Sequence, residues 1–500
     1  MTMDKPLRRV AIFALLLIFG LMAQINYVQG SRADDLQNDA NNQRRFQDIF
    51  SAERGRILAD GQALASSTET GKDRPKYGRS YTEGPLFSPV TGMFSSSGSA
   101  SKIELAYNSL LGGRDKRITN QRWFDTFIGK KAEGADLELA LDTKAQAVAY
   151  NRLKAQTLAG RRGGAAVIDI RTGAIKVLAS FPSYDPNEVA PQTGLQGAKR
   201  LKQLDKGQGV VKPLIDNAMS QTFPPGSTFK IVTAALAMEN NGLDKSSMVH
   251  TGRYHLPESG TLFKNSHDTG HCASRAPLVD AFAESCNSTF GRLAVTMGID
   301  KLNAGAGRFG FNQPIAVEPN VSAAEGDVPV NTTVKDASGQ PKTIKTGADS
   351  TARSGIGQEN VRSTPLQMAM VASAVANDGT MMKPYLVEKV RAKDGSELYT
   401  VRPKVLGKPI KKRTAEQLQE MMRAVVSQGT AKNLQGMRIA GKTGTAETDL
   451  VSKINARWFV GFSPIENPRY AFAVMTEGRD SGGTHAGPTA AAIMTELLKP

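Results

Sequence analysis

The chain has 500 residues, of which 40% are hydrophobic and 22% are charged. This composition supports a buried core and argues against disorder throughout, and the length predicts roughly two to four domains. Lys and Arg number 63 against 47 Asp and Glu, and the net charge of +16 favours an anionic partner such as a membrane surface or an acidic polymer. No nucleic-acid-binding motif accompanies this charge, so no nucleic-acid partner is predicted.

An apolar run lies near the N-terminus. Residues 10–28 form a stretch of 19 mostly apolar residues, close to the roughly 20 that a membrane-spanning helix needs. Lys5, Arg8 and Arg9 precede it, which predicts a cytoplasmic tail at residues 1–9 and the remaining chain outside the cell membrane. A cleaved signal peptide is the alternative. No small-x-small cleavage site follows the run, so a single-pass anchor is favoured.

The chain beyond the anchor is predicted to form an N-terminal region at residues 29–141 and a main domain at residues 142–500. The N-terminal region begins with a predicted polar helix and continues as an extended segment. Residues 68–101 are rich in Gly, Ser and Pro and are predicted to be a loop. A short helix is expected over residues 103–113, where two glycines end it.

Helix and strand patterns in the main domain predict an α+β fold. Residues 143–160 form a predicted helix that ends at a glycine, and residues 163–180 read as two apolar strands around a Thr-Gly turn. Residues 456–478 repeat the hairpin pattern with a longer turn, and residues 489–499 form the last helix. Strands from both ends of a domain, with helices between them, indicate a central antiparallel sheet covered by helices.

A serine and a lysine open the apolar segment "STFKIVTAALAMEN". Ser227 and Lys230 are three positions apart, which places them on one face of a helix. A lysine among apolar neighbours is favoured in its neutral form, as a base must be, and a serine beside a base is an activated nucleophile. The alternative is an N-cap serine with an ordinary lysine. The pattern recurs at Ser99–Lys102, but there it opens no comparable apolar helix.

Two further motifs follow in order. Ser285 and Asn287 enclose a cysteine in "SCN", although both residue types are also common caps of helices and turns. Lys442 begins "KTGT", which precedes two apolar strand patterns. At a strand edge an extended peptide could pair with the backbone, with Gly444 permitting close approach and Lys442 attracting a carboxylate. A second K-T-G at residues 345–347 is not followed by such strands.

These motifs carry a family resemblance. S-x-x-K, S-D-N and K-T-G are the signature of penicillin-binding proteins and class A β-lactamases, and here Cys286 replaces the Asp. The chain resembles the class B penicillin-binding proteins, the membrane-anchored D,D-transpeptidases of bacterial cell-wall synthesis, and most of all the penicillin-binding protein A type of actinobacteria. Residues 54–65 resemble the family's N-terminal extended motif. Residues 354–369 resemble a segment that leads into a helix behind the site, with Thr364 as its expected N-cap.

The resemblance implies a fold and a mechanism. The fold is a transpeptidase domain like that of serine β-lactamases, with an N-terminal pedestal domain and a membrane anchor. Ser227 is expected to attack the D-Ala–D-Ala donor of a peptidoglycan stem peptide and form an acyl-enzyme, which an amine of a second stem peptide resolves into a cross-link. Lys230 is the expected base and Ser285 a proton relay, and penicillin and other β-lactams would acylate the same serine. The expected substrate-binding residues are Asn287, Lys442, Thr443, Gly444 and Thr445.

The cysteines and histidines allow more than one interpretation. Cys272 and Cys286 lie fourteen residues apart on the side predicted to be exported, where they could form a disulfide or remain separate thiols. A bridge would stiffen a loop beside the site. His267 and His271 are four positions apart but lack the glutamate of the zinc-protease motif, so they are interpreted as loop residues. Neither a metal nor a cofactor is predicted.

Other activities share the same motifs. A D,D-carboxypeptidase, a β-lactam sensor or β-lactamase, and a non-catalytic scaffold of the division machinery are the alternatives. The anchor and the long region at residues 29–141 argue against a secreted β-lactamase. That region is too short for a glycosyltransferase domain, so the resemblance implies a separate glycosyltransferase or another division protein as partner.

Overall fold

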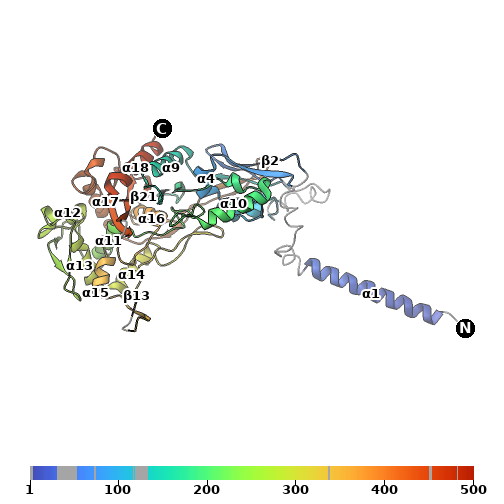
Figure 1. Cartoon of the computed structure of the whole chain (residues 1–500), viewed down its shortest axis with the longest axis horizontal. Helices are drawn as coiled ribbons and strands as arrows, with labels where there is room; N and C mark the ends of the chain where they lie inside the picture. Colours follow the sequence, from blue (N-terminus) through green and yellow to red (C-terminus); the bar gives the residue numbers. More distant parts are fainter. Residues whose placement is uncertain are drawn as a thin grey trace.

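A computed structural model describes residues 4–30, 53–72, 75–115, 118, 133–335, 338–449, 453–480 and 482–499. Helix α1 spans Asp4–Gly30, and its stretch Arg8–Val28 is the one helix in this described part that is long and apolar enough to cross a membrane (Figure 1). None of that stretch is buried. The predicted polar helix that follows the anchor lies outside the described residues.

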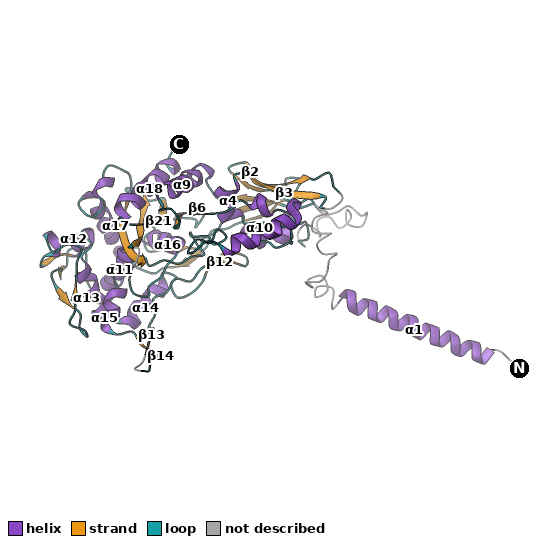
Figure 2. Ribbon diagram, in the orientation of Figure 1, coloured by secondary structure: helices purple, strands orange, loops and turns teal. Residues whose placement is uncertain are grey.

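A six-stranded sheet forms the centre of the pedestal (Figure 2). Its inner strands β1 and β4 run parallel, and the other neighbours run antiparallel. Two of its strands follow the predicted boundary at residues 141/142 by more than two hundred residues, so the pedestal and the main domain share one sheet. The boundary itself stays a prediction. In spatial order the strands are β17 (Glu397–Thr400), β16 (Val387–Arg391), β4 (Asp136–Leu139), β1 (Ile57–Ala59), β2 (Gln62–Glu69) and β3 (Tyr77–Tyr81).

The prediction of a loop at residues 68–101 is wrong over much of its length. Strand β3 pairs with β2, and helix α4 (Gly84–Thr91) follows, with a proline in its first turn and Phe87 fully buried. Tertiary packing of such apolar residues outweighs the local Gly, Ser and Pro signal. The helix expected over residues 103–113 is divided at Tyr107 into α5 (Lys102–Ala106) and α6 (Asn108–Leu111).

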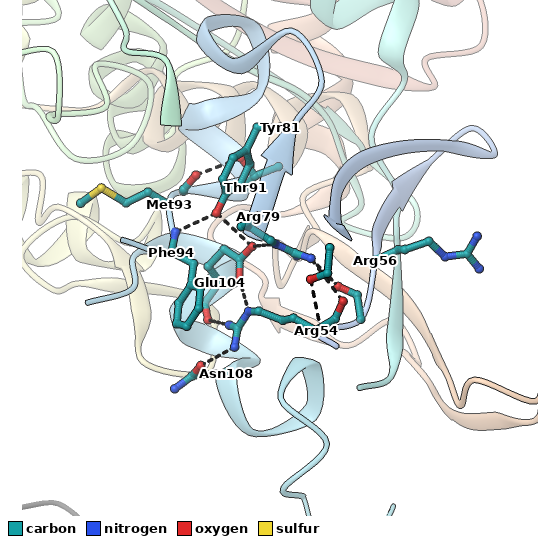
Figure 3. Close-up of polar contacts among 12 residues, drawn as sticks. Arg54, Arg56, Arg79, Tyr81, Thr91, Met93, Phe94, Glu104 and Asn108 are labelled. Atoms are coloured by element: carbon teal, nitrogen blue, oxygen red, sulfur yellow. Dashed lines mark hydrogen bonds and ion pairs between the residues drawn. The ribbon is translucent and has the colours of Figure 1, made fainter. Parts of the chain in front are cut away.

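A buried ionic network ties the pedestal together (Figure 3). Glu104 on α5 is fully buried, and its two carboxylate oxygens each accept a hydrogen bond of 2.7 Å, one from Arg54 Nε and one from Arg79 Nε. Tyr81 donates to the same carboxylate at 3.2 Å and accepts from the backbone N–H of Phe94 at 2.7 Å. The guanidinium of Arg54 also lies over the Phe94 ring. The segment before β1 is therefore joined to β3 and α5 by side chains as well as by sheet pairing.

The main domain contains the predicted antiparallel sheet. Both predicted hairpins are present, and β21 pairs with β5, so strands from the two ends of the domain are neighbours. The strand that carries "KTGT" is at the edge of this sheet, as the motif requires. In spatial order the strands are β19 (Ala440–Asp449), β20 (Ile454–Ser463), β21 (Tyr470–Gly478), β5 (Gly163–Asp169) and β6 (Ile175–Phe181).

Helices cover this sheet (Figure 1). Helix α9 (Thr143–Gln156) ends four residues before the predicted stop, and α18 (Gly482–Leu497), which packs beside it, begins seven residues before the predicted start. Helix α16 (Pro365–Ala376) packs on β20, β21 and β5, and α17 (Lys412–Ser427) packs on β19. Thr364 caps α16 as predicted, because its side chain accepts from the backbone N–H of Gln367 at 3.0 Å.

A helical lobe completes the main domain beside α17. It contains α11 (Lys230–Asn241), α12 (Leu278–Ala283), α13 (Asn287–Met297), α14 (Ile299–Arg308) and α15 (Ala348–Ser354). Helix α10 (Gly194–Lys206) lies apart from it, near the pedestal (Figure 2). The remaining short strands form two-stranded antiparallel sheets. They pair as β7 (Met248–His250) with β10 (Arg275–Pro277), β8 (Tyr254–His255) with β9 (Leu262–Phe263), β11 (Ile315–Glu318) with β12 (Val321–Ala323), β13 (Asn331–Lys335) with β14 (Pro341–Lys345), and β15 (Met381–Met382) with β18 (Val405–Gly407).

Candidate active site

Ser227 lies on a tight turn at the start of α11. The turn is a 3-10 helix, Gly226–Phe229, and Pro225 rather than Ser227 holds its N-cap position. The N-cap interpretation of the serine is therefore wrong. Gly226 has a φ of 53°, a left-handed conformation that glycine adopts without strain. Ser227 is partly exposed, and its hydroxyl forms no hydrogen bond within the described part of the chain.

Lys230 reaches the SCN motif rather than Ser227. The lysine is fully buried, and its Nζ atom lies 2.7 Å from the Ser285 carbonyl oxygen, 3.0 Å from Ser285 Oγ and 2.7 Å from Asn287 Oδ1. Asn287 opens α13 and is oriented by a second bond, in which its amide nitrogen donates to the Lys264 carbonyl at 3.0 Å. Ser285 has a φ of 62°, so the motif holds a non-glycine residue in the left-handed region beside the lysine.

Lys442 meets the same serine from the sheet. Its Nζ atom donates to Ser285 Oγ at 2.9 Å and to the Thr443 carbonyl at 3.1 Å, and its side chain is fully buried. The three motifs predicted from the sequence are thus joined at one atom, since Ser285 Oγ contacts both lysine amines. Phe290 and Phe282 lie beside the amines of Lys230 and Lys442 respectively, which adds apolar surface around both charges.

Burial shifts the protonation of both lysines. Desolvation, reinforced by the charge of Lys442, lowers the pKa of Lys230 well below 10.5. Desolvation also lowers the pKa of Lys442 to about 7. A neutral Lys230 amine has two N–H donors and one lone pair, and two of its three partners are carbonyl-type oxygens that can only accept. The lone pair then faces Ser285, whose hydroxyl can donate to Lys230 while it accepts from Lys442. This arrangement fits a proton relay at Ser285.

Strand β19 packs tightly against the turn that carries Ser227. A Cβ atom added at Gly444 would lie 2.8 Å from the Pro225 carbonyl oxygen and 2.8 Å from Thr228 Cγ2. A Cβ atom added at Gly226 would lie 2.7 Å from the Thr445 carbonyl oxygen. The expected close approach at Gly444 is therefore present, although here its partner is the serine turn. Glycine at both positions brings the strand edge next to Ser227.

The threonines of the KTGT motif have partners that the sequence did not indicate. The hydroxyls of Thr443 and Thr430 lie 2.5 Å apart, and Thr445 Oγ1 accepts from the backbone N–H of Gly482 at 3.4 Å. Gly357, within the segment predicted to lie behind the site, accepts from the N–H of Gly226 at 2.9 Å and contacts the serine turn directly. Thr430 precedes the motif by more than ten residues in a loop, and no local pattern marks it.

The two repeated patterns lie elsewhere. Lys102 of the second S-x-x-K is at the start of α5, and its amine contacts Asp216 at 3.0 Å. Lys345 of the second K-T-G ends strand β14 of a separate two-stranded hairpin and forms an exposed ion pair with Asp300. Neither of these lysines belongs to the Ser285 cluster, which Lys230 and Lys442 contact instead.

Cys272 and Cys286 are joined as a disulfide, with 5.4 Å between their Cα atoms. Because Cys286 stands between Ser285 and Asn287, the bridge fixes the SCN motif to the loop before β10. His267 and His271 are both exposed in that loop. His267 lies beside Cys272 and Glu284, a grouping that the histidine spacing did not predict.

The site and fold agree with comparisons to known proteins. The chain matches the family described as the penicillin binding protein transpeptidase domain over residues 163–495, and the penicillin binding protein A dimerisation domain over residues 54–137. It therefore belongs to the penicillin-binding protein transpeptidase family. The peptidoglycan D,D-transpeptidase PbpA of Mycolicibacterium smegmatis is 34% identical, with 99% of each chain covered. The peptidoglycan D,D-transpeptidase MrdA of Escherichia coli is 28% identical over 73% of this chain and 57% of its own length.

Solved structures show the same likeness. Penicillin-binding protein A from Mycobacterium tuberculosis, as its ceftriaxone acyl-enzyme complex, has a TM-score of 0.81 and 29% identity, covering 91% of this chain and all of its own. The penicillin G acyl-enzyme complex of the same protein has a TM-score of 0.80 and 30% identity, covering 90% of this chain. The predicted fold class and family are confirmed.

Proposed function

We propose that the chain is a serine D,D-transpeptidase that cross-links peptidoglycan stem peptides and is acylated by β-lactams at Ser227. The observation that carries the proposal is the meeting of two buried lysine amines on Ser285 Oγ, beside the turn that presents Ser227. Family membership supports the activity, as do the transpeptidase names of the similar proteins and the β-lactam acyl-enzyme complexes of the similar structures.

Acylation begins at the exposed serine. Ser227 Oγ attacks the carbonyl carbon between the two D-Ala residues, and neutral Lys230 takes the hydroxyl proton after its lone pair turns from Ser285 toward Ser227. The carbon–nitrogen bond breaks, and the leaving D-Ala amine receives a proton through Ser285, whose hydroxyl contacts both lysines. An amine of a second stem peptide then attacks the ester and releases Ser227, which forms the cross-link.

The strand edge binds the donor. Lys442, Thr443 and Thr445 bind the carboxylate of the terminal D-Ala, Gly444 lets the substrate backbone approach, and Asn287 holds a substrate amide. The backbone N–H groups of Ser227 and Thr445 form the oxyanion hole, and each such donor typically contributes about 3–4 kcal/mol of transition-state stabilisation. An extended donor peptide can pair with β19 because this strand is at the edge of its sheet.

The chain is proposed to be a single-pass membrane protein. The apolar stretch Arg8–Val28 forms the anchor, the tail at residues 1–9 lies in the cytoplasm, and the positive residues before the span set this orientation. Residues 29–141 form the pedestal and residues 142–500 the transpeptidase domain, both outside the membrane. A chain that only cross-links needs newly made glycan strands, so a glycosyltransferase or another division protein is the proposed partner.

Mass spectrometry of the intact full-length chain in detergent, followed over time with penicillin, tests the activity. One penicillin adduct is expected on the wild-type chain and none on Ser227→Ala. Ser99→Ala, in the second S-x-x-K, is the matched control and should acylate normally. An adduct that hydrolyses within seconds would indicate a β-lactamase instead. With a D-Ala–D-Ala peptide and an acceptor amine, release of D-Ala without any amide product would indicate a carboxypeptidase.

A further inference from the structure

Three side chains with metal-binding atoms meet beside the SCN motif, and a fourth is bonded to one of them. A ring nitrogen of His267, the sulfur of Cys272 and a carboxylate oxygen of Glu284 all lie within 4.8 Å of one another. Cys286 carries a second sulfur, bonded to that of Cys272, which lies outside the 4.8 Å group in the oxidised chain. His271 is in the same loop but lies outside this group of donor atoms. The mechanism proposed above uses none of these four side chains.

We propose that reduction of the Cys272–Cys286 disulfide creates a zinc site formed by the two cysteines, His267 and Glu284. A dithiol reductant supplies the two electrons: the S–S bond of the protein breaks, the dithiol closes to its own disulfide, and its two protons pass to the cysteine sulfurs. Zn²⁺ then binds both sulfurs as thiolates and releases those two protons to solvent. The disulfide and the zinc site are alternative links at the same place.

The donor set suits zinc. Two thiolates, one imidazole and one carboxylate are all established zinc ligands, and thiolates favour zinc over magnesium or calcium. With zinc–sulfur bonds of about 2.3 Å in a tetrahedral site, the two sulfurs must separate to about 3.8 Å. The 5.4 Å between the Cα atoms leaves room for that separation. The donor atoms of His267, Cys272 and Glu284 are already within 4.8 Å of one another, and Cys286 joins them once the S–S bond is broken and its sulfur moves.

The surroundings provide both access and support. Both cysteines are 1% exposed, whereas His267 is exposed, so an ion can enter from the histidine side. Glu284 is oriented by the backbone N–H of His271, which donates to its carboxylate at 3.1 Å. The Cys272 carbonyl accepts from the Asn265 amide at 3.3 Å. These two hydrogen bonds hold the loop independently of the S–S bond. In metal sites, hydrogen bonds of this kind orient the side chains that bind the ion.

The site has a structural consequence for the motif next to it. Cys286 lies between Ser285 and Asn287, the two residues that hold Lys230. A zinc ion that links Cys286 to the loop would keep this motif tethered after the disulfide is reduced. Zinc binding itself does not depend on the activity proposed above, so it can be measured without any activity readout.

Zinc titration of the full-length chain in detergent tests the proposal, with a chromophoric chelator as competitor. The chain is measured oxidised, and again after reduction by a dithiol that is then removed anaerobically. The oxidised chain should bind no zinc at this place, and the reduced chain one ion. His267→Ala should weaken zinc binding by the reduced chain at least about tenfold, since even indirect partners of a metal contribute that much.

His271→Ala is the comparison variant, because this neighbouring exposed histidine is outside the donor group although its Nε2 atom lies 3.9 Å from a Glu284 carboxylate oxygen. Its zinc affinity should fall by much less than that of His267→Ala. Equal binding by the oxidised and reduced chains would overturn the proposal. Equal binding by the reduced chain and its His267→Ala variant would also overturn it, because thiols exposed by unfolding bind zinc without needing this histidine.

Discussion

The two buried lysines at Ser285 are coupled through their charges. Desolvation and the nearby charge of Lys442 lower the pKa of Lys230, and desolvation lowers the pKa of Lys442 to about 7. A base must be neutral, so the acylation rate should rise with pH as Lys230 loses its proton. Because its pKa is lowered in the folded chain, the rate should level off well before pH 10.5, the ordinary value for lysine.

Lys442→Met should move this rising limb to higher pH. The substitution removes a positive neighbour that disfavours protonated Lys230, so the pKa of Lys230 rises and a higher pH is needed to form the base. The measurement is the second-order rate of penicillin acylation as a function of pH. Lys345→Met, at the second K-T-G, is the control and should leave the midpoint unchanged. A midpoint that stays fixed or moves to lower pH in Lys442→Met would contradict the coupling.

The sequence offers candidate residues for this site but not their contacts. Motif order and context separated Ser227 and Lys442 from their repeats, because each motif needs a particular helix or strand after it. The helical spacing of Ser227 and Lys230 suggested that these two would contact each other, yet Lys230 contacts Ser285 and Asn287. Those residues are more than fifty positions away, and no local rule predicts which distant loop will face a buried amine.

At the scale of elements, the site depends on how closely β19 packs against the serine turn. Gly444→Ala would place a Cβ atom 2.8 Å from the backbone carbonyl of Pro225, so the strand and the turn must separate. We expect a loss of stability of about 1–3 kcal/mol, as for other overpacked sites, together with slower acylation. Penicillin labelling and thermal unfolding measure the two effects.

Gly307→Ala on α14 is the matched control for this substitution. A Cβ atom there would meet nothing within 4 Å beyond its own stretch of helix, and alanine is a better helix former than glycine. Its acylation rate should be unchanged and its stability equal or slightly higher. If Gly444→Ala acylated as fast as Gly307→Ala, the close approach of strand and turn would not be needed for the reaction.

At the scale of the whole molecule, the pedestal depends on a buried charge that the sequence did not reveal. The sequence placed residues 54–65 as an extended motif but predicted a loop where β3 and α4 form. The pairing of Glu104 with both Arg54 and Arg79 joins segments twenty-five and fifty residues apart. Local composition carries no information about such pairs, so the pedestal was harder to predict than the central sheet, whose apolar hairpins are strong local signals.

Glu104→Gln should strongly destabilise the pedestal. Burial alone would raise the pKa of Glu104, but the two guanidinium groups outweigh it and the pKa lies below its usual value, so the group is a carboxylate at neutral pH. Removing its charge leaves two buried cations without their counter-ion, which typically costs about 3–5 kcal/mol. Denaturant unfolding measures this loss. Glu69→Gln, which breaks the exposed pair with Lys76, is the control, with an expected loss of about 0–1 kcal/mol.

The pedestal and the transpeptidase domain also meet at one buried carboxylate. Glu318, at the end of β11, accepts from the Tyr107 hydroxyl at 2.6 Å and from the backbone N–H groups of Leu386 and Val387 at 2.6 Å and 2.8 Å. Tyr107 lies between α5 and α6, while Leu386 and Val387 lead into the strand β16 that the two parts share. This carboxylate therefore joins the pedestal helices, the shared sheet and strand β11 of the main domain.

Glu318→Ala should loosen this junction, because it leaves buried donors without acceptors at about 1–3 kcal/mol each. Amide hydrogen exchange at Leu386 and Val387 should become faster. Glu318→Gln is the matched control, since its carbonyl oxygen can still accept from both N–H groups and exchange should stay slow. Equal exchange rates in the alanine and glutamine variants would show that the carboxylate does not hold the two parts together.

The same carboxyl group should make the stability of the chain depend on pH. Burial raises the pKa of Glu318, so the folded chain retains this proton more readily than the unfolded chain. The free energy of unfolding should therefore fall as pH rises from about 4.5 through that raised pKa, and Glu318→Gln should remove this fall.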